Sequence, residues 1–523
     1  MPLDLTPVLQ LPWFFAAIVT TLACFRSMII WRTRSRGRPL PPGPRRFPVI
    51  GNMLSMPTWK PWRGFRDISE TYGKMVYLEV LGKPMLVLSS PDVMNELLDK
   101  HSAKTSSRAQ TPLIVLAGQA FNFAFLPYGQ LWRTHRRMFW QHFHPGKMTS
   151  YWPVQREVTR KFLVKLLDKS VDLQKAIQYA VTAATMKITY DIDIDEEEDK
   201  WISVVDEAFV GLRLVTVSAQ FLLEHLPIVR HIPAWFPGAG FQRTLARARA
   251  PSDYMLDVPF TIAKKATDPE TVSVVADIIR RSGSSGLGAE NEQVARRVTA
   301  SAVEGGSDTT FSTIQGILLA LSLNPGLQKK AHAELDAVVG PHRLPDFEDR
   351  DALVYVNAIV KEGLRWHNVL PLGVGHCTTE DEELGGYFIP AGTVIVPNVW
   401  AVMHDLQYYP EPDRFNPDRF IRDGKLDTDV LDPTSFVFGF GRRVCPGRHF
   451  AQSTLFITVA SILHVFNINP PLDERGCPIK IEPAQSHGFI SYPEDCRCRI
   501  SSRSQEAEVL IQVAVAEKVC EQS

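Results

Sequence analysis

The sequence predicts a mainly α-helical fold with a small β component, and three observations lead to this prediction. Apolar residues recur with helical spacing in long stretches, namely 151–187, 199–225, 241–265, 291–323, 325–339, 351–367 and 448–464. Strand-like pieces are few and short, namely 75–80 and 85–89 around Gly82, 387–389, 394–397 and 479–482. No internal repeat is evident, so we expect one large helical domain.

Length and composition narrow the classes of protein. The chain has 523 residues, of which 45% are hydrophobic, and this is enough to bury a large core. The 57 basic residues are balanced by 57 acidic ones, so nothing indicates a nucleic-acid partner. Seven cysteines are too few and too scattered for a disulfide framework, and an odd number suits a reducing compartment.

Residues 11–31 are predicted to form a transmembrane anchor. The segment is almost entirely apolar, and Arg26 is its single charge. Trp13 and Trp31 bracket it, about 27 Å apart in a helix, which is close to the thickness of a bilayer core. Tryptophan is also a residue that membrane interfaces favour.

The charges on either side of this segment predict its orientation. Asp4 is the only charge before it, whereas four arginines follow it, namely Arg32, Arg34, Arg36 and Arg38. The positive-inside rule then places the bulk of the chain in the cytosol. A cleaved signal peptide is the alternative, but its usual basic start is missing and no clear Ala-x-Ala site follows.

The stretch 438–447 contains the most informative motif. It reads Phe-x-x-Gly-x-Arg-x-Cys-x-Gly, with fixed positions at Phe438, Gly441, Arg443, Cys445 and Gly447. Cys445 supplies a sulfur that, as a thiolate, binds haem iron and donates electron density to it. The two glycines let the backbone close around the sulfur. Arg443 can pair with a haem propionate and Phe438 can shield the sulfur from water. The alternative is a buried structural cysteine in a glycine-rich turn.

This decapeptide resembles the haem loop of the cytochromes P-450, the haem-thiolate monooxygenases. The resemblance covers roughly 39–505 together with the anchor, and the ending at 492–503 is similar to that of fungal microsomal members. It implies the cytochrome P-450 fold, preceded by one N-terminal transmembrane helix, with haem b as the cofactor. The implied organisation is a lumenal N-terminus at 1–10, the anchor at 11–31, a basic, proline-rich linker at 32–46, a haem-thiolate catalytic domain at 47–505 and a C-terminal extension at 506–523.

A second motif, Gly-Gly-Ser-Asp-Thr-Thr at 305–310, lies within the predicted helix 291–323. Each mid-helix glycine costs about 1 kcal/mol relative to alanine, but its missing side chain would let a flat cofactor lie against the helix. Thr309 can then hydrogen-bond the oxygen that reacts, and Asp308 can feed it protons from solvent. Taken alone, the motif also suits a helix–helix contact through small residues. Its position ahead of Cys445 is the one that the resemblance requires.

Glu362 and Arg365 stand three residues apart on one face of a predicted helix. The spacing alone means little, because Glu411 and Arg414 share it. In the resembled family the pair is buried, and the arginine of a Pro-x-Arg-Phe segment completes it, which here is Arg419. A third partner satisfies the buried charges, so we expect a structural role in holding the haem loop.

Two further positions resemble the family's propionate-binding residues. Trp132 and Arg136, one helical turn apart, match its Trp-x-x-x-Arg helix. His376 falls where microsomal members often carry a propionate-binding histidine. The sequence departs from the family there, since Gly375 replaces the usual proline and Cys377 follows. An exposed loop histidine is the alternative for His376.

The implied reaction inserts one oxygen atom from dioxygen into an organic substrate and reduces the other to water. No Gly-x-Gly-x-x-Gly fingerprint and no flavin or iron–sulfur ligand set is visible in the sequence. Electrons would therefore come from NADPH through a membrane-bound flavoprotein reductase, and a basic docking face would comprise Arg133, Arg137, Arg442 and Arg448. The expected location is the endoplasmic reticulum membrane, with a single pass and the catalytic domain in the cytosol.

The substrate is expected to be lipophilic, such as a terpenoid, a polyketide or an aromatic compound. Apolar stretches that would line its pocket are 113–126, 226–241, 369–374 and 488–490, although core packing explains each of them equally well. Glu304 would reach either this pocket or a solvent channel.

Two other classes of function stay open. A haem-thiolate isomerase or dehydratase would not need the Asp308–Thr309 pair, because it delivers no protons to oxygen. A non-catalytic haem- or metal-binding protein is the second, although Cys445 and His449 have no second ligand pair at zinc-site spacing.

Overall fold

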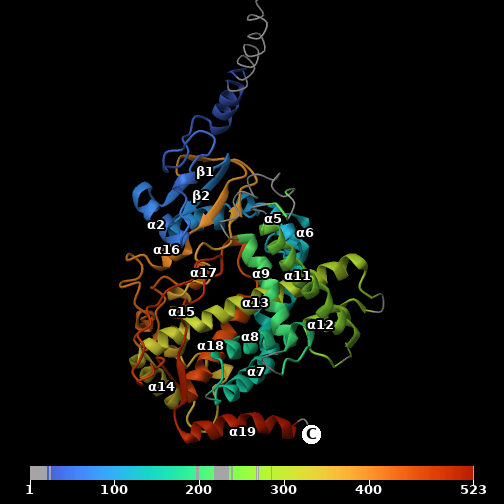
Figure 1. The fold of residues 1–523 in the computed structure, drawn as a ribbon, viewed down its shortest axis with the longest axis vertical. Coiled ribbons are helices and arrows are strands. Elements are labelled where there is room, and N and C mark those ends of the chain that lie inside the picture. The colour runs from blue at the N-terminus through green and yellow to red at the C-terminus, as the bar shows by residue number, and fades with distance from the viewer. Residues whose placement is uncertain are drawn as a thin grey trace, which may run out of the picture.

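The computed structural model describes residues 21–22, 25–168, 170–195, 199–216, 232, 235–236, 240–266, 268, 270–283 and 286–521. Helices form most of this part of the chain, and Figure 1 shows them below a small sheet that lies toward the N-terminal end. Apart from the helical residues 25–35, the α-helices of five residues or more in this part of the chain are α2 (Pro61–Tyr72), α5 (Pro112–Leu116), α6 (Gln130–Phe143), α7 (Trp152–Lys165), α8 (Leu173–Tyr190), α9 (Lys200–Thr216), α11 (Gly240–Ala266), α12 (Val274–Arg281), α13 (Ala289–Leu323), α14 (Pro325–Val338), α15 (Val354–Trp366), α16 (Val399–Met403), α18 (Arg448–Val465) and α19 (Gln505–Glu521).

The long helix α13 is the central element of the helical body (Figure 1). It packs against α8, α6, α15 and α18, and most of its side chains from Val294 to Ser322 are buried. Helix α18 is buried on nearly all sides as well, because its sequence is apolar all round. The cavity described below lies between these helices and the sheet.

The principal sheet has four strands in the order β1 (Met75–Val80), β2 (Lys83–Leu88), β6 (Val394–Pro397) and β3 (His376–Cys377). Strand β2 pairs antiparallel with β1 and parallel with β6, and β3 pairs antiparallel with β6. Three two-stranded sheets complete the β component, formed by β4 (Glu382–Leu384) with β5 (Tyr387–Ile389), β7 (Ile421–Arg422) with β8 (Lys425–Leu426), and β9 (Phe466–Asn469) with β10 (Arg499–Ser502).

Most of the predicted elements are confirmed, and two predictions are wrong. Residues 151–187 do not form one helix but split into α7 and α8, since the Asp172 carboxylate caps a new helix by accepting hydrogen bonds from the N–H groups of Gln174 and Lys175. Residues 479–482 form no strand, because a proline-rich loop with exposed side chains surrounds them. The predicted helix 199–225 is α9 up to Thr216, and its remainder lies outside the described residues.

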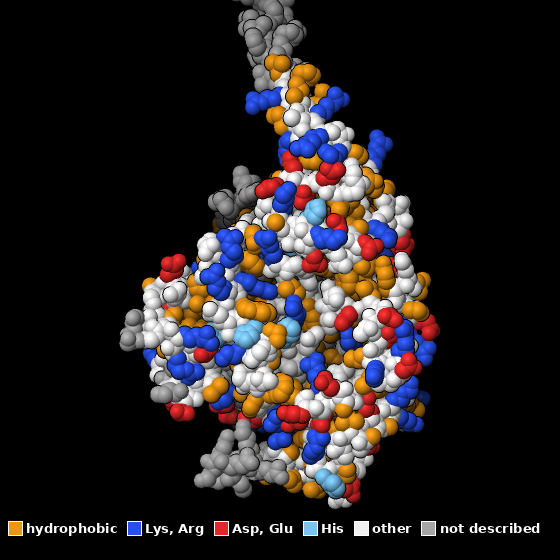
Figure 2. All heavy atoms as spheres, turned by 180° about the vertical axis from the view of Figure 1, so that it is seen from behind, with side chains coloured by type: hydrophobic (Ala, Val, Ile, Leu, Met, Phe, Trp, Pro, Cys, Tyr) orange, Lys and Arg blue, Asp and Glu red, His pale blue; other side chains and the backbone are white. Residues whose placement is uncertain are grey.

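The predicted anchor at 11–31 falls largely outside the described residues. Residues 25–35 are helical and rise from the body as a stem with apolar and basic side chains (Figures 1 and 2). Within the described residues, no helix is both long enough and apolar enough to cross a membrane. Phe25 and Ile29 on the stem are 56% and 49% exposed.

Residues 32–46, the predicted linker, lie against the body of the molecule. Arg34 pairs with Asp381 at 2.5 Å, and the N–H of Phe388 donates to the carbonyl of Pro39 at 2.8 Å. The Trp31 ring packs edge-on against Phe388, with ring centroids 5.3 Å apart. The base of the stem is therefore attached to the β4–β5 hairpin.

The C-terminal extension at 506–523 forms most of α19, which runs along the lower end of the body in Figure 1. Ile511 is buried, and Arg160 on α7 donates to the carbonyl of Ala514 at 3.3 Å. This segment is thus packed against the helical body over its described part.

Candidate haem and substrate site

Cys445 lines a cavity of about 290 Å³ that is bordered by α13, α6, the loop 438–447 and the loop before β3. Its N–H donates to the carbonyl of Phe438 at 2.6 Å, which closes the loop around the sulfur. Burial raises the pKa of the thiol, and the Gly447 N–H together with the Arg136 guanidinium opposes that rise. Helix α18 begins three residues later at Arg448, so its positive end lies near the sulfur.

The two glycines of the loop have different roles. Gly441 has φ +50°, and a Cβ there would lie 2.3 Å from the carbonyl oxygen of Leu98, so no other residue fits. Its N–H donates to the Asp99 carboxylate. Gly447 has ordinary φ, and its contribution is the N–H that points to the Cys445 sulfur. The Phe438 ring borders the same cavity and is half-buried.

Three arginines, namely Arg108, Arg136 and Arg443, form a cationic wall of this cavity, and His376 borders the same cavity. Burial lowers the pKa of Arg443 to about 8, and the neighbouring guanidinium of Arg108 contributes to this shift. Burial also lowers the pKa of Arg108 to about 9. Within the described residues, no carboxylate pairs with Arg108, Arg136 or Arg443.

The contacts of Arg443 show what would fit beside it. Its Nε donates to the carbonyl of Ser106 and one Nη to that of Leu126, both at 2.7 Å, while its Nη1 is buried without a hydrogen-bond partner. The guanidinium lies 4.4 Å from the centroid of the Trp132 ring. An unsatisfied buried N–H beside uncompensated cations fits the carboxylates of a haem, so the residues present suit this cofactor.

His376 is buried, and the alternative of an exposed loop histidine is wrong. His376 lies on β3 of the principal sheet, and its Nδ1 is 2.9 Å from the carbonyl oxygen of Thr105. Desolvation holds its pKa well below the ordinary value, and the nearby guanidinium of Arg108 acts in the same direction. His376 therefore stands at the cavity as a neutral hydrogen-bonding group.

Both mid-helix glycines of α13 border the cavity, and Gly306 also fits the helix–helix contact that the sequence allowed. A Cβ on Gly305 would meet nothing within 4 Å, and Gly305 borders the cavity. A Cβ on Gly306 would lie 3.1 Å from the Thr185 side chain, so this glycine allows α8 to approach closely. Thr309 also borders the cavity, and its hydroxyl donates to the carbonyl of Gly305 at 2.8 Å.

Asp308 points away from Thr309, toward α9 and the segment near the C-terminus. Its carboxylate accepts a hydrogen bond from the Tyr492 hydroxyl and lies 3.5 Å from the Arg213 guanidinium. The side chain is buried and does not line the cavity. Burial raises the pKa of Asp308, and Arg213 acts in the opposite direction. The structure thus does not bring the carboxylate into contact with the Thr309 hydroxyl.

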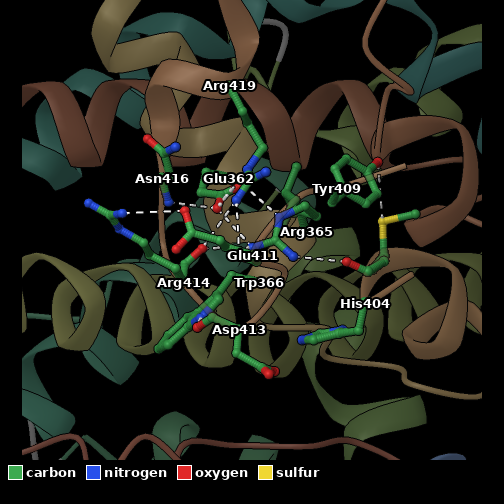
Figure 3. Close-up of polar contacts among 12 residues, drawn as sticks. Glu362, Arg365, Trp366, His404, Tyr409, Glu411, Asp413, Arg414, Asn416 and Arg419 are labelled. Atoms are coloured by element: carbon green, nitrogen blue, oxygen red, sulfur yellow. Dashed lines mark hydrogen bonds and ion pairs between the residues drawn. The ribbon is translucent and has the colours of Figure 1, made fainter. Parts of the chain in front are cut away.

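Glu362 and Arg365 form a fully buried bidentate pair with N–O distances of 2.7 and 2.8 Å (Figure 3). The Arg419 Nε lies 3.3 Å from the Glu362 carboxylate, and the Asn416 N–H donates to it at 2.7 Å. The remaining Arg365 nitrogen donates to the carbonyl of Met403 at 2.8 Å. Each charge therefore has several partners, as a buried ion pair requires.

The remaining cavity wall is mostly apolar and aromatic. Segments near 123, 209, 370 and 489 provide it, and representative residues are Phe123, Phe125, Phe209, Leu370 and Phe489. The predicted lining segment at 226–241 lies largely outside the described residues. Glu304 and Asn122 are polar members of the wall.

Sequence reasoning missed two residues of this site. Arg108 donates to the carbonyls of Ala124 and Val374, and such distant partners leave no local signal in the sequence. His367 also borders the cavity. Its ring bridges Ser312 at 2.8 Å and Gln485 at 3.1 Å, and its position directly after the Glu362–Arg365 helix was the available signal.

Comparisons with known proteins agree with this geometry. A family model described as Cytochrome P450 matches residues 41–494. Two cytochrome P450 monooxygenases of Coprinopsis cinerea, COX2 and COX1, are 38% and 39% identical to this chain; the matches cover 91% of this chain and 92% and 94% of the relatives. A tryptamine 4-monooxygenase of Psilocybe cyanescens is 34% identical over 90% of this chain and 95% of its own length. The chain therefore belongs to the cytochrome P450 family, and it is a haem-thiolate monooxygenase of the fungal kind.

Proposed function

We propose that this monooxygenase is anchored in the endoplasmic reticulum membrane and oxidises a lipophilic small molecule, such as a terpenoid, a polyketide or an aromatic compound. The observation that carries the proposal is the placement of Cys445. Its side chain shares one cavity with Thr309 and with three arginines that have no carboxylate partner among the described residues.

Haem b would be held by Cys445 at its iron and by Trp132, Arg136, His376 and Arg443 around its propionates. When bound, the haem supplies the activation of dioxygen, to which thiolate ligation contributes. Arg443 donates two hydrogen bonds to backbone carbonyls, and these bonds hold its guanidinium in place beside the cavity. Its third nitrogen is the donor available to a propionate.

Proton delivery is assigned to Thr309 and Asp308. The Thr309 hydroxyl borders the cavity and can exchange its bond to the Gly305 carbonyl for one to the reacting oxygen. Asp308 must rotate away from Tyr492 and Arg213 before its proton reaches the cavity side of α13.

The apolar and aromatic wall supports a lipophilic substrate. The relative from Psilocybe cyanescens is named for tryptamine, which is an aromatic compound. The exposed apolar side chains of the stem at 25–35 support an entry into the bilayer at that end of the molecule.

Electrons are proposed to come from NADPH through a flavoprotein reductase that docks on the basic side chains around the cysteine loop. Arg442 on that loop and Arg133 on α6 both lie over the Tyr128 ring, at 5.2 and 5.6 Å from its centroid. Two arginines that converge on one half-buried aromatic ring give a basic surface to which an acidic partner is attracted.

The test is turnover of lipophilic probes by membranes that contain the chain and a fungal NADPH-dependent reductase, under isotope-labelled dioxygen. We expect products that carry one labelled oxygen atom, and no product without the reductase. Thr309→Val should lower product formation by about 100-fold, the lower end of the range for a lost proton donor. Thr299→Val, at a buried threonine of α13 that bonds Ala295 in the same way, is the control. Products without the label would show that the chain is not a monooxygenase of these probes.

A further inference from the structure

One wall of the cavity carries a buried carboxyl group to which the proposed oxidation assigns no role. Glu304 lies on α13, about 7.5 Å from Thr309 along the helix axis. Its side chain is 1% exposed and lines the same cavity as Cys445. A carboxyl group in such a place has a large desolvation cost, so its retention needs an explanation.

Two carboxamides hold this carboxyl group in place. Gln119 Nε2 donates to one carboxylate oxygen at 2.7 Å, and Asn122 Nδ2 donates to the other at 2.7 Å. Both come from the segment that follows α5, and both side chains are buried. A carboxylate offers about four acceptor positions, and these two N–H groups occupy two of them.

The carboxyl group has no cation beside it in the described part of the chain. Arg213, which approaches α13 from α9, pairs with Asp308 instead. Burial accordingly raises the pKa of Glu304 to about 7, although both amide N–H groups act in the opposite direction. The cavity thus offers a fixed acceptor with an uncompensated negative charge in an apolar setting.

We propose that Glu304, held by Gln119 and Asn122, binds the protonated amine of a lipophilic substrate. The inference rests on the proposed function, because it assigns a substrate class to the same cavity. The ammonium would sit at Glu304 and the hydrocarbon part would lie along the aromatic wall. The distance of each substrate carbon from the amine then determines which carbon lies on the side of the cavity that Cys445 borders.

A cation fits this group better than a neutral donor does. An alcohol would add one hydrogen bond to Glu304 but would leave its buried charge uncompensated. An ammonium adds a charge-assisted hydrogen bond and also offsets the desolvation of the carboxylate. Most of the remaining cavity wall is apolar and aromatic, so it suits the carbon skeleton rather than a second charge.

The test compares two probes of equal length, N,N-dimethyl-4-phenylbutylamine and 4-phenylbutan-1-ol, by titration of the Soret band of the full-length haem protein at pH 7.5. We expect the amine to bind at least 10-fold more tightly than the alcohol. Glu304→Gln should abolish this preference by weakening the amine alone, and Glu304→Asp should retain it. Gln119 can accommodate the new amide, because its own Oε1 is buried without a partner and can turn to accept a hydrogen bond.

Glu334→Gln is the matched control. Glu334 on α14 is also a carboxylate that accepts two N–H bonds, from Tyr355 at 2.6 Å and Val356 at 3.0 Å, but it lies outside the cavity. Equal affinities for the two probes in the wild type, or a preference that survives in Glu304→Gln, would overturn the inference. So would a red-shifted Soret band that shows the amine nitrogen bound to iron.

These outcomes are separable from a failure of the proposed function. If the wild type shows the thiolate-type spectrum and oxidises the alcohol without preferring the amine, only the inference fails. If Glu304→Gln does not take up haem, Asn122→Leu is the substitute variant. It should lower the preference for the amine, because it removes one of the two N–H groups that hold the Glu304 carboxylate in place.

Discussion

At the scale of single residues, the buried arginines explain why an anionic cofactor is expected to bind in this cavity. Arg108 and Arg443 are held among backbone carbonyls, and burial lowers the pKa of both. Burying a guanidinium group without a carboxylate partner destabilises the folded chain, and an anionic ligand that pairs with the group offsets this destabilisation. Haem binding is therefore expected to depend on both arginines, including Arg108, which lies far from Cys445 in the sequence.

Arg108→Met is predicted to speed the dissociation of haem by about 10-fold or more, because one charge-assisted hydrogen bond contributes about 1.5–3 kcal/mol. The measurement is the rate at which haem moves from the purified protein to an excess of a haem-free acceptor globin. Arg137→Met, at an exposed arginine of α6, is the control and should dissociate at the wild-type rate. An unchanged rate of haem dissociation in Arg108→Met would show that this arginine does not help to bind haem.

His367 connects the cavity to the pH dependence of stability. The Ser312 hydroxyl donates to the carbonyl of Ser491, so it accepts from the Nε2–H of His367, while the Nδ1 of His367 accepts from Gln485. Burial lowers the pKa of His367 to about 4. Because the folded pKa is depressed, the contribution of this histidine to stability is present at neutral pH and is lost as the pH falls from about 6.5 to about 4.

His367→Gln is predicted to reduce this acid sensitivity. The difference in the free energy of unfolding between wild type and variant should shrink by about 2 kcal/mol from pH 7.5 to pH 5, because only the wild type loses the contribution of a neutral histidine. Urea unfolding of the haem-loaded proteins at both pH values measures it, with exposed His342→Gln as the control. A difference that stays constant between the two pH values would contradict the assignment of a neutral His367.

At the scale of elements, the position of a charge pair matters more than its spacing in the sequence. Glu362 with Arg365 on α15 and Glu411 with Arg414 both stand at i and i+3. The first pair is 0% exposed and has four hydrogen bonds to neighbouring segments (Figure 3), whereas the second is about two-thirds exposed and 3.4 Å apart. Sequence spacing alone does not distinguish them, and the resemblance to a known family did.

Glu362→Gln is predicted to lower the free energy of unfolding by about 3–5 kcal/mol, because it leaves the buried charges of Arg365 and Arg419 without their carboxylate. Glu411→Gln, the matched change in the exposed pair, should alter it by about 0.5 kcal/mol or less. Urea unfolding of the haem-loaded proteins compares the two. Equal effects of the two substitutions would show that the buried pair does not stabilise this part of the fold.

The elements that the sequence predicts well are those whose signal is local. The hairpin around Gly82 and the helices α13 and α18 follow from periodicity, and the cysteine loop follows from its fixed residue types. The break between α7 and α8 was missed even though Asp172 is a good helix cap. The direction of Asp308 and the partners of Arg108 depend on segments far away in the chain, and no local pattern specifies them.

At the scale of the whole molecule, one cavity joins the elements that the chemistry needs. Helix α13 provides Thr309 and Glu304, the loop before α18 provides Cys445, and α6 provides Arg136. The described stem at 25–35 leaves the body from the end at which the small sheet lies (Figure 1).

We expect deletion of residues 1–31 to move the protein from the membrane fraction to the soluble fraction without changing its haem spectrum.

The central claim is that Cys445 binds the haem iron as a thiolate. The most direct test is the difference spectrum of the reduced, carbon-monoxide-bound protein in membranes, for the wild type, Cys445→Ala and the exposed-cysteine control Cys477→Ala. The account predicts a thiolate-type Soret band in the wild type and in Cys477→Ala, and its loss in Cys445→Ala. A histidine-type band in the wild type, or a thiolate-type band that survives in Cys445→Ala, would contradict the account.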